Sequence, residues 1–173
     1  KKYSVRKLIF TSSPSVVFGD SSLEGVDESI SYPEKYLCDY PLTKAIAEKM
    51  VLQANGSLLS TVAIRPHLIW GPGDPHLVPR ILEKAKKNKL VQVGDGKNKV
   101  DMIYIDNVVS AHLLACKALE GDTNVSGKAY FVSDGEPVVL WDWINQLLRK
   151  MDKSNVSRKI SYKNAMRLGA FLE

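Results

Sequence analysis

The chain has 173 residues, of which 45% are hydrophobic and 25% charged, and its formal net charge is +5. This composition is that of an ordinary globular protein and excludes the disordered and fibrous classes. The Lys and Arg residues are scattered along the chain rather than arranged in a stripe, which argues against a nucleic acid as partner.

The two cysteines, Cys38 and Cys116, lie far apart and belong to no CxxC or His-paired spacing. They predict reduced thiols in a cytoplasmic protein rather than a disulfide framework or a metal site. No segment is apolar for long enough to span a bilayer. The chain begins without Met and enters a buried-strand pattern almost at once, so we expect a fragment of a longer protein.

The first half of the chain predicts strand, loop, helix and strand in turn. Val5 to Ser12 is a β-rich run that predicts a central parallel strand buried on both faces. Residues 14–33 have the composition of a loop. Residues 40–53 carry apolar side chains at helical spacing, and Asn55-Gly56 ends the predicted helix. Ser60 to Trp70 predicts a second apolar strand, which a Gly- and Pro-rich run ends.

The second half continues to alternate between strands and helices, which predicts an α/β layered sheet. The predicted strands are Val91–Val93, Met102–Ile105 and Lys128–Ser133, and the predicted helices are Val78–Asn88, Asn107–Leu119, Leu140–Met151 and Tyr162–Phe171.

Tyr40 and Lys44 stand four residues apart in the run YPLTK, within the first predicted helix. That spacing puts both side chains on one face, so an ammonium can lie beside a phenol. A free phenol has a pKa of about 10, and a nearby cation lowers it toward the range useful for proton transfer at neutral pH. An isolated Tyr/Lys pair of this kind is more often a surface phenol beside a solvated amine. The neighbouring sequence therefore decides whether the pair is a catalytic candidate.

Hydroxyl groups follow the first predicted strand, at Ser12, Ser13 and Ser15. Open α/β sheets bind their ligands at the carboxyl ends of the strands, where a hydroxyl can polarise a carbonyl. The second predicted strand ends in Arg65-Pro66-His67, so both strands bring polar groups to this edge. Arg65 lies just inside the strand end and can instead be structural.

Five blocks of the sequence, in order, resemble the extended short-chain dehydrogenases/reductases and, within them, the 3β-hydroxysteroid dehydrogenase/isomerase group. The blocks are LIFTSSPSVVFGD, YPLTKAIAEK, AIRPHLIWGPGD, VDMIYIDNVVSAHLLA and GKAYFVSDGEP. The resemblance covers nearly the whole chain from Lys7 onward. It implies a Rossmann-like α/β fold with a doubly wound parallel sheet, and a small α/β substrate-binding portion at about 71–100 and 134–173.

The resemblance implies catalytic roles for residues that match the family's motifs. Tyr40 would be the general acid/base of an NAD(P)-dependent oxidoreductase. Lys44 would lower the pKa of the Tyr40 phenol and bind the ribose hydroxyls of the nicotinamide cofactor. The serine role falls best on Ser13, with Ser12 and Ser15 as alternatives.

The resemblance also implies binding roles at the end of the second predicted strand. Pro66 and His67 would approach the nicotinamide end of the cofactor through backbone groups, and His67 would also contact substrate or else pack as a loop histidine. His76 and His112 are expected to be structural.

The dinucleotide-binding fold needs a glycine-rich phosphate turn after its first strand, and this sequence contains none. Gly71-Pro72-Gly73-Asp74 follows a late strand and includes Pro, and Gly94-Asp95-Gly96 is expected to be a turn between strands. We therefore expect NADP or NAD as cofactor of the longer parent protein. We expect weak cofactor binding and no activity for this chain alone, and no bound metal.

Two substrate classes fit within the steroid dehydrogenase group, and both are large apolar acids with a β-keto or β-hydroxy group. Several blocks resemble the NADPH-dependent 2-alkyl-3-oxoalkanoate reductases of bacterial olefin biosynthesis, and similar blocks occur in sterol-4α-carboxylate 3-dehydrogenases. Arg80, at the start of a predicted helix, is a candidate partner for the substrate carboxylate, because a guanidinium binds a carboxylate bidentately. The alternative is a solvated helix arginine.

Nucleotide-sugar epimerases and dehydratases share the fold and the Tyr/Lys pair, but they commonly carry an Arg where this sequence reads Lys99-Val100-Asp101. The difference favours a lipid-like small molecule as substrate. A non-catalytic binding protein of the same fold is the remaining alternative, disfavoured because Tyr40 and Lys44 are both present. Further candidate partners are a second copy, through the Tyr-bearing helix, and a membrane surface contacted peripherally by the parent.

Overall fold

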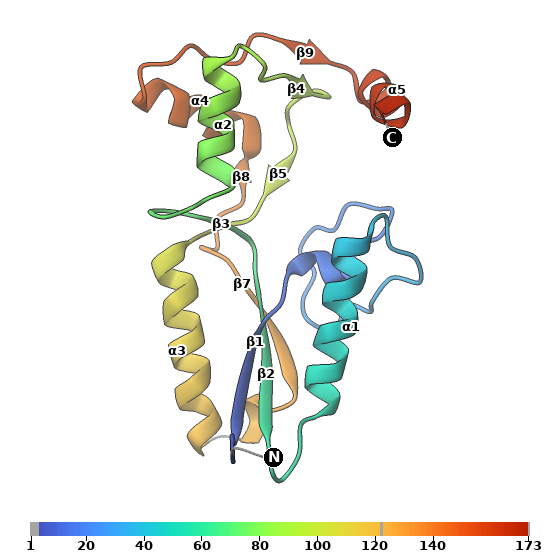
Figure 1. Ribbon diagram of the computed structural model, residues 1–173, viewed down its shortest axis with the longest axis vertical. Helices are drawn as coiled ribbons and strands as arrows, with labels where there is room; N and C mark the ends of the chain where they lie inside the picture. Colours follow the sequence, from blue (N-terminus) through green and yellow to red (C-terminus); the bar gives the residue numbers. More distant parts are fainter. Residues whose placement is uncertain (1–3, 122, 173) are drawn as a thin grey trace. The chain divides into compact units, whose positions relative to one another are not determined.

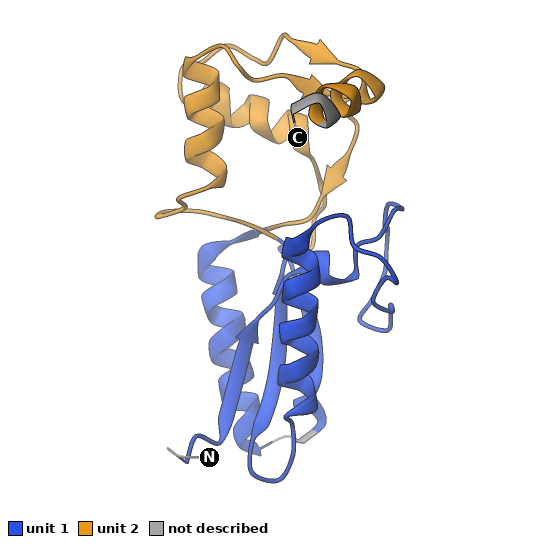
Figure 2. Ribbon diagram, turned by 45° about the vertical axis from the view of Figure 1, so that its right-hand side comes forward, with its two compact units in different colours: residues 1–67, 103–134 blue, residues 68–102, 135–173 orange. Residues whose placement is uncertain are grey.

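The computed structural model describes residues 4–121 and 123–172. The chain divides into two compact units, which Figure 2 colours separately. The first unit comprises residues 1–67 and 103–134, and the second comprises residues 68–102 and 135–173. Each unit is therefore built from two segments that lie apart in the sequence.

A three-stranded parallel sheet forms the centre of the first unit. Its strands are β1 (Lys7–Thr11), β2 (Ser60–Pro66) and β7 (Lys128–Val132), in the order β1-β2-β7. The expected parallel α/β architecture is confirmed. One expectation differs from the structure, because β2 is the central strand and β1 is an edge of the described sheet, with Leu8 37% exposed.

Two long helices cover opposite faces of this sheet, as Figure 1 shows. The first, α1 (Asp39–Gln53), connects β1 to β2 and tolerates Pro41 because N–H groups of the first turn have no intrahelical partner. The second, α3 (Ile105–Gly121), precedes β7, with the short 3-10 helix η2 (Thr123–Val125) between them. Both long helices were predicted from the sequence, within a few residues at each end.

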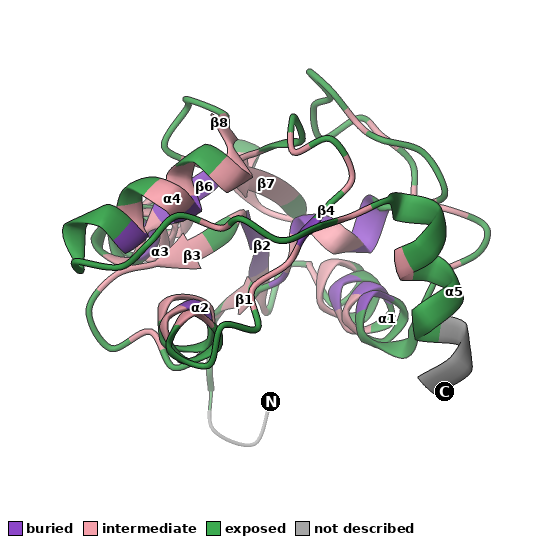
Figure 3. Ribbon diagram, turned by 90° about the horizontal axis from the view of Figure 1, so that it is seen from above, coloured by how far each residue is buried: buried purple, intermediate pink, exposed green. Residues whose placement is uncertain are grey.

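The core of the first unit includes most of β2 and much of η1 (Pro14–Val17), and Figure 3 colours the buried residues purple. Val62, Ala63 and Ile64 of β2 are at most 3% exposed. Val16, Val17 and Ala45 form a second buried group, against which aromatic side chains of the following loop pack. The loop before α1 is therefore held to the sheet by its own apolar residues.

The second unit is built around two packed helices, α2 (Leu77–Lys86) and α4 (Leu140–Lys150). Their buried residues Ile81, Ile144 and Leu148 form its core. Trp70 and Trp143 pack edge to face, with ring centroids 5.7 Å apart.

Short elements complete the chain. They are β3 (Leu68–Trp70), β4 (Gln92–Val93), β5 (Lys99–Val100), β6 (Met102–Tyr104), β8 (Val138–Val139), β9 (Lys159–Ile160) and α5 (Tyr162–Leu172). Strand β4 pairs in parallel with β9, and β5 pairs antiparallel with β8. Of these four two-residue strands only β4 was predicted. A strand of two residues is too short to show the alternation of apolar and polar side chains by which strands are predicted.

The single strand predicted over Ser60 to Trp70 is two strands, β2 and β3, separated at His67. The His67 N–H still donates to Val132 O of β7, whereas Leu68 N–H donates to Asp101 O in the second unit. The apolar run is continuous in sequence, but its backbone hydrogen bonds change partner at His67, from β7 to the segment around Asp101. Within the described ranges, no helix combines the length and apolar character needed to cross a bilayer.

Candidate active site

Lys44 reaches the carboxyl end of β1 from α1. Its ammonium donates a hydrogen bond of 2.5 Å to the carbonyl oxygen of Thr11 and lies 4.5 Å from the ring centroid of Phe10. The side chain is half-buried. A cation is thus held at the sheet edge at which open α/β folds bind their ligands.

Tyr40 lies one turn before Lys44 on α1, in the first turn of the helix. The residue is 60% exposed, and among the described residues its hydroxyl has no hydrogen-bond partner. A phenol in this position remains accessible to a ligand at the sheet edge. The local spacing that predicted a shared helical face is therefore realised, because Tyr40 and Lys44 both belong to the same continuous helix.

The three candidate serines differ in their surroundings. Ser12 is buried, with 5% exposure, whereas Ser13 and Ser15 are half-buried. The Ser13 hydroxyl caps η1 by accepting a hydrogen bond from the Ser15 N–H, and the two hydroxyls lie 2.8 Å apart. Ser13 and Ser15 therefore form one connected hydroxyl pair directly after β1.

Pro66 and His67 lie at the carboxyl end of β2, next to the serines. Ser12 N–H donates to Ile64 O across the β1–β2 pair, and β2 continues to Pro66 through its pairing with β7. Pro66 is buried, and the His67 ring packs tilted against Phe131 at 5.7 Å. The first unit thus brings the serines, Lys44, Pro66 and His67 to one edge.

Arg80, the candidate carboxylate partner, belongs to the second unit, where it lies exposed on α2. His76 is the residue before this helix, and its N–H donates to Asp74. His112 bonds to the Thr11 hydroxyl and to Val108 O, each at 2.8 Å, in line with a structural role. Among residues 4–121 and 123–172 no group of three His, Cys, Asp or Glu is arranged to hold a metal ion.

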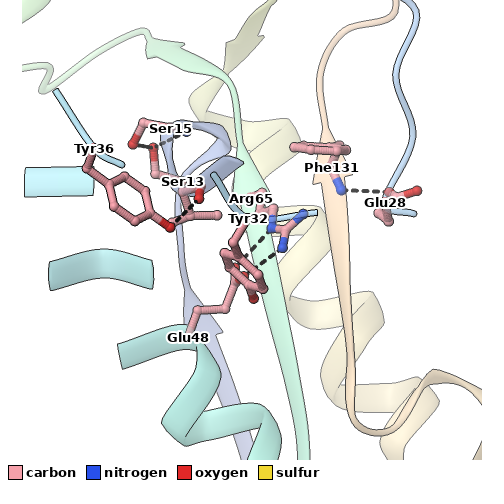
Figure 4. Close-up of polar contacts among 9 residues, drawn as sticks. Ser13, Ser15, Glu28, Tyr32, Tyr36, Glu48, Arg65 and Phe131 are labelled. Atoms are coloured by element: carbon pink, nitrogen blue, oxygen red, sulfur yellow. Dashed lines mark hydrogen bonds and ion pairs between the residues drawn. The ribbon is translucent and has the colours of Figure 1, made fainter. Parts of the chain in front are cut away.

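Sequence reasoning missed a buried polar network behind the site, which Figure 4 shows. Arg65 of β2 donates to both carboxylate oxygens of Glu48, at 2.7 and 3.0 Å, and the Tyr32 hydroxyl donates to the same carboxylate at 2.5 Å. Glu48 is 0% exposed and Arg65 is 3% exposed. A signal was present in the sequence, because a charged residue inside the apolar run STVAIRP requires a buried partner.

The network changes the acidity of its members. Burial alone would raise the pKa of Glu48, but hydrogen bonds from Arg65 and Tyr32 offset it and hold that pKa below its ordinary value. Burial, together with the Glu48 carboxylate that accepts its hydrogen bond, raises the pKa of Tyr32 to about 12. Glu48 is therefore ionised and Tyr32 neutral at physiological pH.

Comparison with known proteins gives a family match over most of the chain. The 3-beta hydroxysteroid dehydrogenase/isomerase family matches residues 1–162. The chain is 46% identical to a 2-alkyl-3-oxoalkanoate reductase of Stenotrophomonas maltophilia, covering 100% of this chain and 53% of that protein. It is 39% identical to the decarboxylating sterol-4-alpha-carboxylate 3-dehydrogenase of Bos taurus, covering 94% of this chain and 46% of that protein. The chain thus spans about half the length of these relatives.

Solved structures match the fold at lower identity. UDP-glucuronic acid 4-epimerase from Bacillus cereus, in complex with UDP-glucuronic acid and NAD, superposes with a TM-score of 0.69 at 26% identity. The match covers 90% of this chain and 48% of the epimerase. An epimerase from Methanothermobacter thermautotrophicus gives a TM-score of 0.71 at 18% identity, over 90% of this chain and 46% of that one.

Proposed function

Since the chain belongs to the 3-beta hydroxysteroid dehydrogenase/isomerase family, we propose that it carries the catalytic residues of an NAD(P)-dependent oxidoreductase. Its substrate is the β-keto or β-hydroxy group of a large apolar acid, and the favoured reaction is reduction of a 2-alkyl-3-oxoalkanoate with NADPH. The observation that carries the proposal is the Lys44 ammonium bound to Thr11 O at the end of β1, one helical turn from an accessible Tyr40.

The residues at the sheet edge divide the chemistry between them. Tyr40 donates a proton to the carbonyl oxygen as the carbonyl carbon is reduced, which yields the hydroxy acid. Lys44 places a positive charge one helical turn from this phenol, where it stabilises the phenolate that forms as the proton leaves. Ser13, hydrogen-bonded to Ser15, holds the substrate oxygen at the same place.

The donors present at the edge fit the nicotinamide end of a dinucleotide. An ammonium can bind ribose hydroxyls, and backbone groups after Pro66 and His67 can bind a carboxamide. The bound cofactor supplies the hydride. The phosphate end requires a glycine-rich turn that this sequence does not contain, so we propose that the chain alone binds NAD(P) weakly and has no turnover.

The choice of substrate is supported by sequence identity rather than by fold. The epimerases resemble the chain in fold at 18% and 26% identity, whereas a 2-alkyl-3-oxoalkanoate reductase is 46% identical. The sterol-4-alpha-carboxylate 3-dehydrogenase reaction is the second candidate, supported by the 39% identity to the bovine protein. Both reactions need a group that binds a carboxylate, and we assign this role to Arg80, with His67 as a further substrate contact.

Nicotinamide absorbance of the complete gene product tests the proposal. One assay contains a 2-alkyl-3-oxo acid with NADPH, and the other contains a 4-carboxysterol with NAD. Oxidation of NADPH by the keto acid is the expected result, and Tyr40→Phe serves as the inactive control. Activity with the sterol alone would select the second candidate, and silence in both assays contradicts the proposal.

Two further proposals concern assembly and location. Leu42, Ile46 and Met50 are spaced four residues apart on α1 and are 39%, 50% and 65% exposed. This apolar stripe supports a homodimer through α1, which sedimentation of the complete gene product tests. The two free cysteines, Cys38 and Cys116, support a reducing cytoplasmic location.

A further inference from the structure

The second unit gathers nine of the protein's 24 Lys and Arg residues at one place. We define the basic tip as residues 83–89 and 149–159, which follow or end α2 and α4. It holds nine cations and two acids, so its net charge of +7 exceeds the +5 of the whole chain. The cations are Lys84, Lys86, Lys87, Lys89, Arg149, Lys150, Lys153, Arg158 and Lys159.

The two segments of the basic tip lie together although some 60 residues separate them in the sequence. Arg158 donates to Asn88 O at 3.2 Å, and Gln92 N–H donates to Arg158 O at 2.9 Å. Beneath them, Ile81 of α2 packs with Leu148 of α4 in the core of this unit. The packing of α2 against α4 therefore joins two segments that are each rich in cations.

Most of this charge is available to a partner. All nine cations are exposed. Within the described ranges, only Lys87 forms an ion pair, with Glu83, and Arg149 and Arg158 bond to neutral groups. Lysines at helix C-termini also interact with the helix dipole, but that interaction engages only the last turn of each helix. It does not account for Lys153, Arg158 and Lys159, which lie beyond α4.

A pocket of about 390 Å³ lies within the basic tip. The residues that line it include Lys86 and Asn88 from the first segment of the tip, and Asp152, Lys153, Ser157 and Arg158 from the second. Three of these side chains are cationic donors and one, Asp152, is an acid, so the lining carries a net positive charge. Their chemistry fits a phosphate group.

We propose that the basic tip docks on an anionic phospholipid bilayer, with one headgroup phosphate bound in this pocket. Juxtaposed Lys and Arg residues are attracted to anionic lipid surfaces, each cation adding to the affinity. Met151, 49% exposed between the cations, supplies an apolar side chain that can enter the interface. The tip contains no aromatic residue on which a nucleic-acid base could stack, which disfavours single-stranded nucleic acid.

Sedimentation of this chain with lipid vesicles tests the proposal directly. Vesicles of phosphatidylcholine with phosphatidylglycerol are expected to bind the chain, and vesicles of phosphatidylcholine alone are not. The double variant Lys86→Gln/Lys153→Gln removes two cations from the pocket, and its affinity should fall roughly 25-fold, at about fivefold per cation. Raising the salt concentration should weaken binding of the unmodified chain, because exposed charges are screened.

The matched control is Lys35→Gln/Lys117→Gln, which changes the net charge equally at exposed lysines of the first unit. Its affinity should remain within about twofold of the unmodified chain, and thermal unfolding should show both variants folded. Equal weakening in the control, or no binding to the anionic vesicles, would overturn the proposal. Tighter binding to duplex DNA than to the vesicles at the same salt would overturn it in favour of a nucleic-acid surface. Vesicle binding requires no cofactor, so its failure is distinguishable from failure of the proposed enzymatic function.

Discussion

Tyr40, Lys44 and Glu48 follow one another at intervals of four along α1, and the three side chains meet three different environments. Tyr40 is exposed, Lys44 is half-buried against the end of β1, and Glu48 is completely buried against Arg65. Burial of the side chains thus increases along this face of α1, from the exposed Tyr40 to the buried Glu48. Two turns below the candidate proton donor, the Glu48–Arg65 pair links α1 to β2.

Replacing Tyr40 by Phe should remove turnover of the complete gene product by several orders of magnitude and leave cofactor affinity nearly unchanged, because only the transferable proton is lost. Lys44→Ala should instead reduce both turnover and cofactor affinity. Steady-state kinetics and cofactor titration measure the two effects. Retained turnover in Tyr40→Phe would exclude the general-acid role.

Glu48→Ala should lower the free energy of unfolding by about 3–5 kcal/mol, because it leaves the Arg65 guanidinium buried without a counter-charge. The double variant Glu48→Leu/Arg65→Met should recover much of this loss, since it removes both charges. Denaturant unfolding measures the difference. A single variant as stable as the unmodified chain would show that the pair contributes little.

Alkaline titration should distinguish Tyr32 from an exposed tyrosine. Its pKa is raised from 10.0 to about 12, so the neutral phenol is favoured in the folded state. The stability that results is fully present below pH 10 and is lost as the pH rises through about 12. Phenolate absorbance should show a tyrosine that titrates at higher pH than the others and that is lost in Tyr32→Phe.

The Glu48 pKa is shifted in the opposite direction. The stability that the Glu48 carboxylate contributes is therefore present above its ordinary pKa and is lost as the pH falls through the lowered value.

At the level of elements, the start of α2 depends on a single carboxylate. Asp74 accepts hydrogen bonds from the N–H groups of His76, Leu77 and Val78, at 2.8, 3.0 and 2.7 Å. These bonds satisfy N–H groups of the first turn that have no intrahelical partner. The Gly- and Pro-rich run around Asp74, which the sequence marks only as a break, is therefore the capping segment of the next helix.

Asp74→Ala should lower the free energy of unfolding by about 0.5–2 kcal/mol, the usual cost of losing a helix cap. Asp74→Asn should cost less, because one oxygen acceptor remains. Thermal unfolding of the two variants makes the comparison. An unchanged midpoint in Asp74→Ala would mean that water replaces the carboxylate without loss.

At the level of the whole molecule, the proposed catalytic groups lie in the first unit and the proposed carboxylate partner lies in the second. The role of Arg80 in binding substrate can therefore be separated from catalysis by kinetics of the complete gene product. Arg80→Ala should raise the KM for the acid substrate and leave kcat less affected, because the guanidinium binds a part of the substrate that does not react. An unchanged KM would discard Arg80 as a substrate contact. Lys97→Ala, in an exposed loop of the same unit, serves as control.

The proteins that resemble the chain in fold and those that resemble it in sequence have names that refer to different substrates. The solved structures that superpose on the chain include sugar-nucleotide enzymes, whereas the curated relatives of higher identity act on apolar acids according to their names. A fold of this kind supports many reactions, so the side chains lining the site decide the substrate.

The sequence by itself determined the features that depend on spacing within a few residues. Helical periodicity located α1, and the four-residue interval placed Tyr40 and Lys44 on one helix, because backbone geometry relates such neighbours wherever the helix lies. Only the tertiary structure decided contacts between distant segments. The pairing of Glu48 with Arg65, the separation of β3 from β2 and the gathering of the basic tip all follow from how elements pack, and packing depends on residues that no local spacing relates.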